Sequence, residues 1–391
     1  MAAGQTVPGK RSLLNSARFR GVLYQVLVVG AVIALGWYLV HNTLTNLAAR
    51  GIATGFDFLG REAGFDIGES PIAYSAADSY AHALLVGLLN TLEVAALGIV
   101  IASVIGLVVG IARLSGNWLV ARLAAIYVEG VRNVPLLLQL FVWYGVVTAL
   151  PGPRQALNPL PGVFLSNRGL KVPVPEDHPV YPWLLLALAV GLVLAWALRR
   201  WAVARQQRTG RPFPWVLCGI GVALGVPLLV FLAAGAPLTM DVPQLRGFNF
   251  SGGATLSPEF AALLAGLSIY TAAFIAEIVR SGILAVPYGQ TEAAMSLGLS
   301  RAKTLRLIVL PQALRVIVPP LTSQYLNLTK NSSLAVAIGY PDLVSVANTT
   351  INQTGHAVEG VGVVMAVFLV ISLALSLLMN WYNAKVALVT R

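Results

Sequence analysis

Charged residues are scarce in this chain. Asp, Glu, Lys and Arg make up 10% of its 391 residues, whereas 57% are hydrophobic, and the mean hydropathy is +0.77. Soluble domains carry about 25% charged residues. This composition therefore excludes an ordinary soluble protein and predicts an all-α protein that crosses a membrane several times.

Cysteine and histidine are also rare. Cys218 is the only cysteine and lies in a hydrophobic stretch, which excludes a disulfide within the chain and a cysteine-based metal site. The four histidines fall in separate segments without the spacing of metal ligands: His41, His82, His178 and His356. We expect no metal ion to be bound by this chain.

Catalytic motifs are missing as well. The segment GQTVPGK, residues 4–10, fits the first part of a phosphate-binding loop, but Arg11 stands where that motif needs Ser or Thr, and no strand precedes it. No GxSxG or HExxH motif is present. We expect no enzyme, and if ATP drives this protein, another chain binds it.

The sequence has eight hydrophobic stretches of about the 20 residues that a membrane span needs. They cover approximately residues 22–40, 84–112, 123–150, 181–201, 215–234, 260–279, 316–340 and 361–384. The first could also be a signal peptide, but its apolar run exceeds the usual length of about 7–15 residues. We interpret it as an uncleaved span.

The net charge of +11 comes from Lys and Arg in short segments between the spans, such as RRWAVARQQRTGR at residues 199–211. Basic residues gather in the cytoplasmic loops of membrane proteins. This rule places both termini in the cytoplasm, and it explains the positive charge by topology, with no nucleic acid as a partner.

One cytoplasmic segment, EAAMSLGLSRAKTLRLIVLP at residues 292–311, is basic and partly polar between two hydrophobic stretches. Thr291 and Ser300 are good N-cap residues, and Gly298 suits the end of a helix. Pro311 is expected to end the second helical run. We predict two short helices joined at Gly298.

Physical chemistry alone leaves two interpretations of this hairpin. Small side chains at Ala293 and Ala294 would allow another protein to approach closely, with Glu292 as a surface acceptor. The same pattern would also suit an amphipathic helix that only anchors a loop at the membrane surface.

The seventh span is the least apolar. Its segment LTSQYLNLTKNSSLAVAIG, residues 321–339, follows an expected bend at Pro319–Pro320. Polar side chains at membrane depth must face a cavity, a partner or one another. The candidate residues of a substrate pathway are Asn327, Lys330, Asn331 and Ser332. Lys330 would meet a substrate carboxylate or, alternatively, form a buried ion pair with Glu277 or Glu93.

Two i,i+3 pairs at expected helix ends have the spacing of intrahelical ion pairs. They are Glu129 with Arg132 and Glu277 with Arg280. The GxxxG pattern from Gly106 to Gly110 would let another helix approach closely.

The spacing of Glu292-Ala293-Ala294, Gly298, Ile308 and Leu310-Pro311 resembles the EAA motif of ATP-binding cassette (ABC) importer permeases. Flanking segments, such as YVEGVRNVPLLLQLFVWY at residues 127–144 and LPQALRVIVPPLTSQYLNLTKNSSL at residues 310–334, resemble the polar amino acid (histidine/glutamine permease-like) branch. The longer architecture of this chain, with its extra region between the two segments, resembles that of the long-form permeases of general L-amino acid or glutamate/glutamine systems. An acidic residue is common after the lysine in this family, and Asn331 stands there instead.

The resemblance implies a type I ABC importer permease fold with these parts: a cytoplasmic tail (1–21), a first span (22–40), a periplasmic loop (41–83), a first conserved block (84–150), an inserted region with spans 4 and 5 (151–258), and a second conserved block (259–391) with a coupling loop (282–311). The residues it implies for coupling to the ATPase are Glu292, Ala293, Ala294, Gly298, Leu310 and Pro311.

The function implied is import of L-amino acids from periplasm to cytoplasm across the bacterial cytoplasmic (inner) membrane. The implied partners are a second similar permease, two copies of a cytoplasmic ATPase that holds ATP and Mg²⁺, a periplasmic amino acid-binding protein, and the lipid bilayer. This chain would hold no cofactor. An ion-coupled secondary transporter is the alternative, which would need inverted repeats and intramembrane carboxylates; a membrane-bound enzyme is a more distant one.

Overall fold

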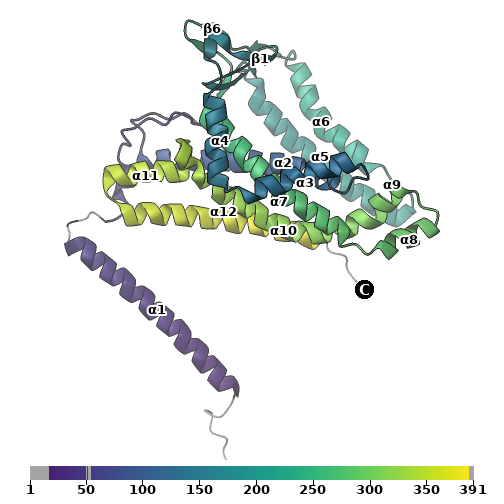
Figure 1. The fold of residues 1–391 in the computed structure, drawn as a ribbon, viewed down its shortest axis with the longest axis horizontal. Coiled ribbons are helices and arrows are strands. Elements are labelled where there is room, and N and C mark those ends of the chain that lie inside the picture. Colours follow the sequence, from purple (N-terminus) through teal and green to yellow (C-terminus); the bar gives the residue numbers. More distant parts are fainter. Residues whose placement is uncertain (1–16, 50, 52–53, 387–391) are drawn as a thin grey trace, which may run out of the picture. The chain divides into compact units, whose positions relative to one another are not determined.

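The computed structural model describes residues 17–49, 51 and 54–386, and it is mostly helical (Figure 1). The chain divides into two compact units, residues 1–133 with 267–391 and residues 134–266. The segment GQTVPGK at residues 4–10 and most of the expected tail, 1–21, lie outside the described residues. The block boundaries expected from the sequence remain predictions.

Seven helical runs within the described residues are long and apolar enough to cross a membrane, or eight if one interrupted pair counts as a span. This confirms the predicted helical membrane protein. The seven belong to α1 (Ala17–Ala49), α2 (Tyr80–Ala112), α5 (Val180–Thr209), α6 (Trp215–Ala233), α7 (Pro258–Leu284), the run Arg301–Ile338, and α12 (Ala357–Val386).

The third expected span, 123–150, is interrupted. It consists of α3 (Trp118–Asn133) and α4 (Leu136–Thr148). Pro135 occupies the N-cap position of α4 with an extended ψ of 137°. Proline lacks an N–H and disfavours helical geometry in the residue before it, so one continuous helix cannot pass through this point.

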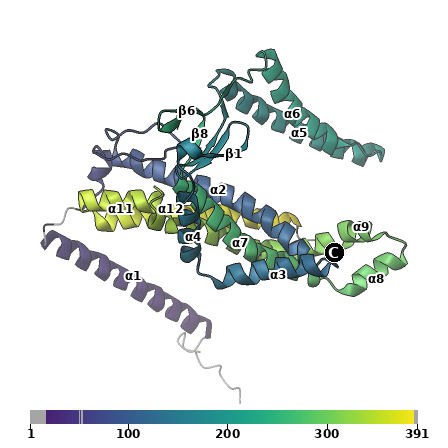
Figure 2. The same ribbon diagram turned by 45° about the horizontal axis from the view of Figure 1, so that its top comes forward.

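Close helix packing builds the core of the first unit. In this unit α2 runs beside α10 (Leu310–Asn331), which also packs against α12 (Figures 1 and 2). A Cβ added at Gly106 would lie 2.6 Å from Ile275 Cβ, and one at Gly110 would lie 2.8 Å from the carbonyl oxygen of Ala276. The GxxxG pattern therefore permits the close approach of α2 to α7.

The segment before α2 is packed rather than loose. Phe58, in the 3-10 helix η2 (Asp57–Gly60), is fully buried and stacks on His356 with ring centroids 4.6 Å apart. Tyr80 and Leu343 belong to the same apolar cluster. The part of the predicted periplasmic loop 41–83 that lies between α1 and α2 therefore packs, from residue 58 to residue 74, against α2 and α11 (Leu343–Thr354).

The second unit contains α4, the helical hairpin of α5 and α6, and the first turns of α7 (Figure 2). It also contains eight short strands, which the helix-only expectation missed. They are β1 (Leu157–Leu160), β2 (Val163–Ser166), β3 (Gly169–Val172), β4 (Val174–Pro175), β5 (Met240–Asp241), β6 (Gln244–Arg246), β7 (Asn249–Ser251) and β8 (Ala254–Leu256).

The strands flank the α5–α6 hairpin in the sequence and pair antiparallel. One sheet has the order β1-β2-β3-β8, and β4 pairs with β5 and β6 with β7. Phe164 and Phe250 stack with centroids 4.5 Å apart. Strands that precede the hairpin therefore pair with strands that follow it, β3 with β8 and β4 with β5.

Candidate functional site

The two-helix hairpin predicted around Gly298 is present. Helix α8 (Tyr288–Ser296) is followed by the C-cap residue Leu297 and then by Gly298, which has a left-handed φ of 79°. The N–H of Leu299 donates to the carbonyl oxygen of Ala294 at 3.1 Å, and the N–H of Gly298 donates to that of Met295 at 2.9 Å. These are the two bonds of a Schellman C-cap, which favours glycine at this position.

The boundaries of the two helices differ from the prediction. Helix α8 starts at Tyr288 after Pro287, three residues before Thr291, so Thr291 is not its cap. Ser300 does take the N-cap position of α9 (Arg301–Thr304), although its side chain makes no capping bond.

Pro311 does not end the second run, contrary to the prediction. Helix α9 continues through a π-helix, η4 (Leu305–Val309), into α10. The N–H of Leu310 donates to the carbonyl oxygen of Leu305, which is the i,i+5 bond of a π turn. Pro311 is the second residue of α10, where the register has just shifted and a missing N–H is tolerated.

The outer surface of the hairpin exposes the predicted coupling residues. Glu292, Ala293 and Gly298 are exposed, as are Leu310 and Pro311, whereas Ala294 is buried against the rest of the hairpin. Large apolar side chains share this surface, and Leu297 next to Gly298 is 82% exposed. Leu297 lies outside every candidate span, and exposed apolar groups in such a place are typical of a surface that contacts another protein.

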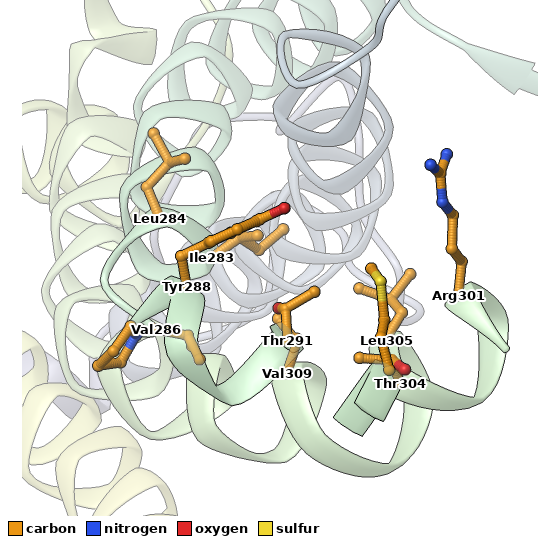
Figure 3. A pocket seen from close by; sticks show the side chains of 11 residues that line it. Ile283, Leu284, Val286, Tyr288, Thr291, Arg301, Thr304, Leu305 and Val309 are labelled. Carbon is orange, nitrogen blue, oxygen red and sulfur yellow. The ribbon is translucent and has the colours of Figure 1, made fainter. Parts of the chain in front are cut away.

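A hollow of about 470 Å³ lies on the inner side of the hairpin. Figure 3 shows Tyr288 and Thr291 on one side, Leu305 on the other, and the guanidinium of Arg301 pointing away from the apolar side chains. The hydroxyl of Thr304 is buried here and has no hydrogen-bond partner within the described residues. The full lining is Ile283, Leu284, Val286, Pro287, Tyr288, Thr291, Met295, Arg301, Thr304, Leu305 and Val309.

The candidate pathway residues do not all face the same way. Asn327 and Lys330 are exposed on α10, one turn apart, and Asn331 is half-buried beside them. Ser332 is buried and donates to the carbonyl oxygen of Thr329 at 2.7 Å. The polar stripe on α10 is therefore formed by the first three, and Ser332 belongs to the backbone turn of the 3-10 helix η5 (Ser332–Ile338).

Lys330 forms no ion pair with any residue that the structure describes, so neither Glu277 nor Glu93 neutralises it within this chain. Glu277 instead binds Arg280, as predicted, at 2.5 Å, and also Arg113, the C-cap residue of α2. This three-residue cluster joins the end of α2 to α7. The sequence spacing predicted the Glu277–Arg280 pair of this cluster but not the contact of Glu277 with Arg113.

The other predicted pair is absent from the described residues. Arg132 lies over the ring of Phe274, 5.1 Å from its centroid, rather than pairing with Glu129. A guanidinium gains from an aromatic face as well as from a carboxylate, and the i,i+3 spacing alone does not distinguish the two.

Residues 98–387 match the family described as binding-protein-dependent transport system inner membrane component. The chain belongs to this family. It is a permease subunit of an ABC transporter, a multi-pass protein of the bacterial inner membrane, and not itself an enzyme.

Three relatives align over almost their whole length. The general L-amino acid transport system permease protein AapQ of Rhizobium johnstonii is 50% identical, covering 97% of this chain and 96% of its own. The putative amino-acid ABC transporter permease protein YhdX of Escherichia coli is 53% identical, covering 99% and 98%. The glutamate/glutamine/aspartate/asparagine transport system permease protein BztB of Rhodobacter capsulatus is 41% identical, covering 97% and 96%.

These matches confirm the family that the EAA-like spacing indicated. They include the inserted α5–α6 region, because the alignments extend over nearly the whole chain. An ABC permease works in a complex with an ATPase and a binding protein, so the ion-coupled secondary transporter and the membrane enzyme no longer explain the chain.

Proposed function

We propose that this permease subunit imports L-amino acids from the periplasm and that residues 282–311 receive the motion of a cytoplasmic ATPase. The observation that carries the substrate class is the near-complete alignment with AapQ and YhdX, because the names of both relatives specify amino acids. ATP and Mg²⁺ then belong to the ATPase, and this chain holds neither.

The geometry of the hairpin supports the coupling role. The Schellman cap fixes the angle between α8 and α9, and the run from α9 into α10 is continuous. A push on the exposed side of Glu292, Ala293 and Leu297 is carried along this helical run toward the polar stripe of α10. The run includes the π-helix η4 and two internal prolines, Pro319 and Pro320. Coupling needs such an element with two alternative positions, each favoured by one state of the ATPase.

The proposed complex contains a second similar permease, two ATPase copies and a periplasmic binding protein, with both termini of this chain in the cytoplasm. The stripe of Asn327, Lys330 and Asn331 supports a pathway between two permeases. A cation facing lipid costs about 2.5 kcal/mol or more, so Lys330 needs water, substrate or a partner beside it.

Uptake by the assembled transporter tests this proposal. Cells that express the chain with its cognate partners are given labelled L-amino acids, with a sugar as the control solute, and Lys330→Met is compared with Ser323→Ala on the same helix. We expect ATP-dependent uptake of amino acids only. We expect Lys330→Met to reduce it at least tenfold, the effect of losing about 1.4 kcal/mol or more of contact with a carboxylate.

Absence of amino acid uptake by the wild-type complex would refute the substrate class. Normal uptake by the Lys330→Met variant would remove Lys330 from the pathway and leave the substrate class standing. The Ser323→Ala control is expected to transport normally.

A further inference from the structure

The inserted hairpin of α5 and α6 carries an arginine-rich end. Five arginines lie within thirteen residues there: Arg199, Arg200, Arg205, Arg208 and Arg211. No Asp or Glu occurs from residue 178 to residue 240. These guanidinium groups therefore have no carboxylate partner on their own hairpin, and none of them forms an ion pair within the described residues.

Aromatic rings hold three of the five in place. Arg199 lies over the ring of Trp215 of α6 at 5.2 Å, and Arg200 over that of Trp196 at 5.1 Å. Arg205 lies over Trp201 at 5.4 Å and over Phe213 at 5.8 Å. A guanidinium stacked on a ring keeps its in-plane N–H groups free to donate.

A hollow of about 460 Å³ opens between the two leading arginines. It is lined by Trp196, Arg199, Arg200, Val203, Ala204 and Gln207, all from one face of α5. It is the size of a small ligand site. Its charged groups are two guanidinium groups, Gln207 adds an amide, and no acidic group lines it.

The position of the hollow along α5 indicates which layer of the membrane it faces. Arg199 lies about 28 Å along the helix from Val180, at the 1.5 Å rise of an α-helix. The hydrocarbon core is about 30 Å thick. The arginines therefore lie where the apolar part of α5 ends, and Trp196 and Trp201 match the usual position of tryptophan at the headgroup level.

We propose that this end of the α5–α6 hairpin binds the phosphate of an anionic phospholipid, held between Arg199 and Arg200. Two fork-shaped guanidinium groups suit a phosphodiester oxygen pair, and basic pockets at this depth recognise lipid headgroups. The positive-inside rule explains why basic residues lie at this end of the hairpin, but it does not require them to stack on aromatic rings. The stacking of three arginines on four rings is an additional constraint, and for Arg199 and Arg200 it orients donors that line the hollow.

Lipid retention by the purified transporter complex tests the proposal. The complex is washed in detergent and titrated with phosphatidylglycerol or phosphatidylcholine, and bound lipid is counted by native mass spectrometry. Three paired variants are compared with wild type: Arg199→Gln with Arg200→Gln, Arg199→Lys with Arg200→Lys, and Arg208→Gln with Arg211→Gln. The last pair removes the same charge from the same end of the hairpin without touching a stacked arginine.

We expect wild type to prefer phosphatidylglycerol and the glutamine pair at Arg199 and Arg200 to lose that preference. The lysine pair keeps the charges and hence the topology, yet we expect its affinity to fall about tenfold because stacking and the fork geometry are lost. The pair at Arg208 and Arg211 is expected to retain the lipid.

Equal losses in the two glutamine pairs, or unchanged binding in the lysine pair, would overturn the proposal in favour of general charge attraction. Equal retention of phosphatidylcholine would overturn it too. Displacement of the lipid by millimolar inorganic phosphate would show an anion site without lipid specificity. These readouts do not depend on amino acid uptake, so they stand apart from the proposed transport function.

Discussion

Asp342 is a buried carboxylic acid at the start of α11, between the candidate spans Arg301–Ile338 and Ala357–Ala384. Its Oδ1 accepts the N–H of Ser345 at 2.8 Å, which caps the helix. Its Oδ2 is buried and has no hydrogen-bond partner within the described residues. One carboxyl oxygen therefore stabilises the start of α11, while the other is desolvated without a compensating hydrogen bond.

Burial raises the pKa of Asp342 to about 7, and the backbone N–H groups of Ser345 and Val344 only partly offset it. In the unfolded chain this carboxyl would titrate near its ordinary value of 3.8. Between about pH 4 and pH 7 the folded protein thus holds a proton that the unfolded chain has released. Its contribution to the free energy of unfolding must fall as the pH rises through this window.

Asp342→Asn removes this titration and keeps a good N-cap residue. We expect the variant to lose less thermal stability than wild type when the pH is raised from 5 to 8, measured as the unfolding temperature in detergent. Asp78→Asn is the control. The pKa of exposed Asp78 is lowered, mainly by the Ser75 N–H, so its titration lies below this window. Parallel pH profiles for wild type and Asp342→Asn would contradict the assignment.

Single residues were predictable where the backbone demands one residue type. Gly298 followed from the left-handed turn, and the Glu277–Arg280 pair from helix spacing. Asp342 was missed because a lone acid has no periodic pattern and its burial depends on α2, far away in sequence. Arg132 was assigned the wrong partner because Phe274 lies on another helix.

Among the helices, the contact of α2 with α7 depends on Gly106. The Cβ of an alanine there would lie 2.6 Å from Ile275 Cβ and 3.0 Å from the carbonyl oxygen of Ala272. Gly130 on α3 has no atom within 4 Å of such a Cβ. A glycine-to-alanine substitution therefore collides with α7 at Gly106 and points into open space at Gly130.

We expect Gly106→Ala to lower the free energy of unfolding by about 1–3 kcal/mol because the helices must move apart. Gly130→Ala should be neutral or stabilise by up to about 1 kcal/mol, because alanine is the better helix former. Thermal unfolding of the two purified variants measures this difference. Equal shifts in the same direction would show that α2 and α7 do not pack this closely.

Elements were predictable to the extent that hydrophobic length defines them. The spans follow from apolar runs, but Pro135 divides the third, and a hydropathy window does not register that break. The strands of the second unit have only two to four residues each. Their pairing joins segments on both sides of the α5–α6 hairpin, so no local pattern indicated them.

At the scale of the whole molecule, the hairpin at Gly298 is the site at which we propose that a separate ATPase contacts this permease. The family was recognisable from the spacing of Glu292, Gly298 and Pro311 in that segment, and the left-handed turn at Gly298 restricts the residue type there. The pathway was only partly recognisable. The sequence grouped four polar residues of α10, and burial separated Ser332 from the exposed three.

The most direct measurement is co-purification of the cognate ATPase with the tagged permease, comparing Gly298→Val with Gly289→Val. Valine at Gly298 must adopt a φ of 79°, which β-branched residues strongly disfavour. Gly289 lies inside α8, the helix that Gly298 follows, and it has open space around it and an ordinary helical backbone. The account predicts that Gly298→Val inserts normally but loses both the ATPase and transport, while Gly289→Val retains both. Full ATPase binding and transport by Gly298→Val would contradict it.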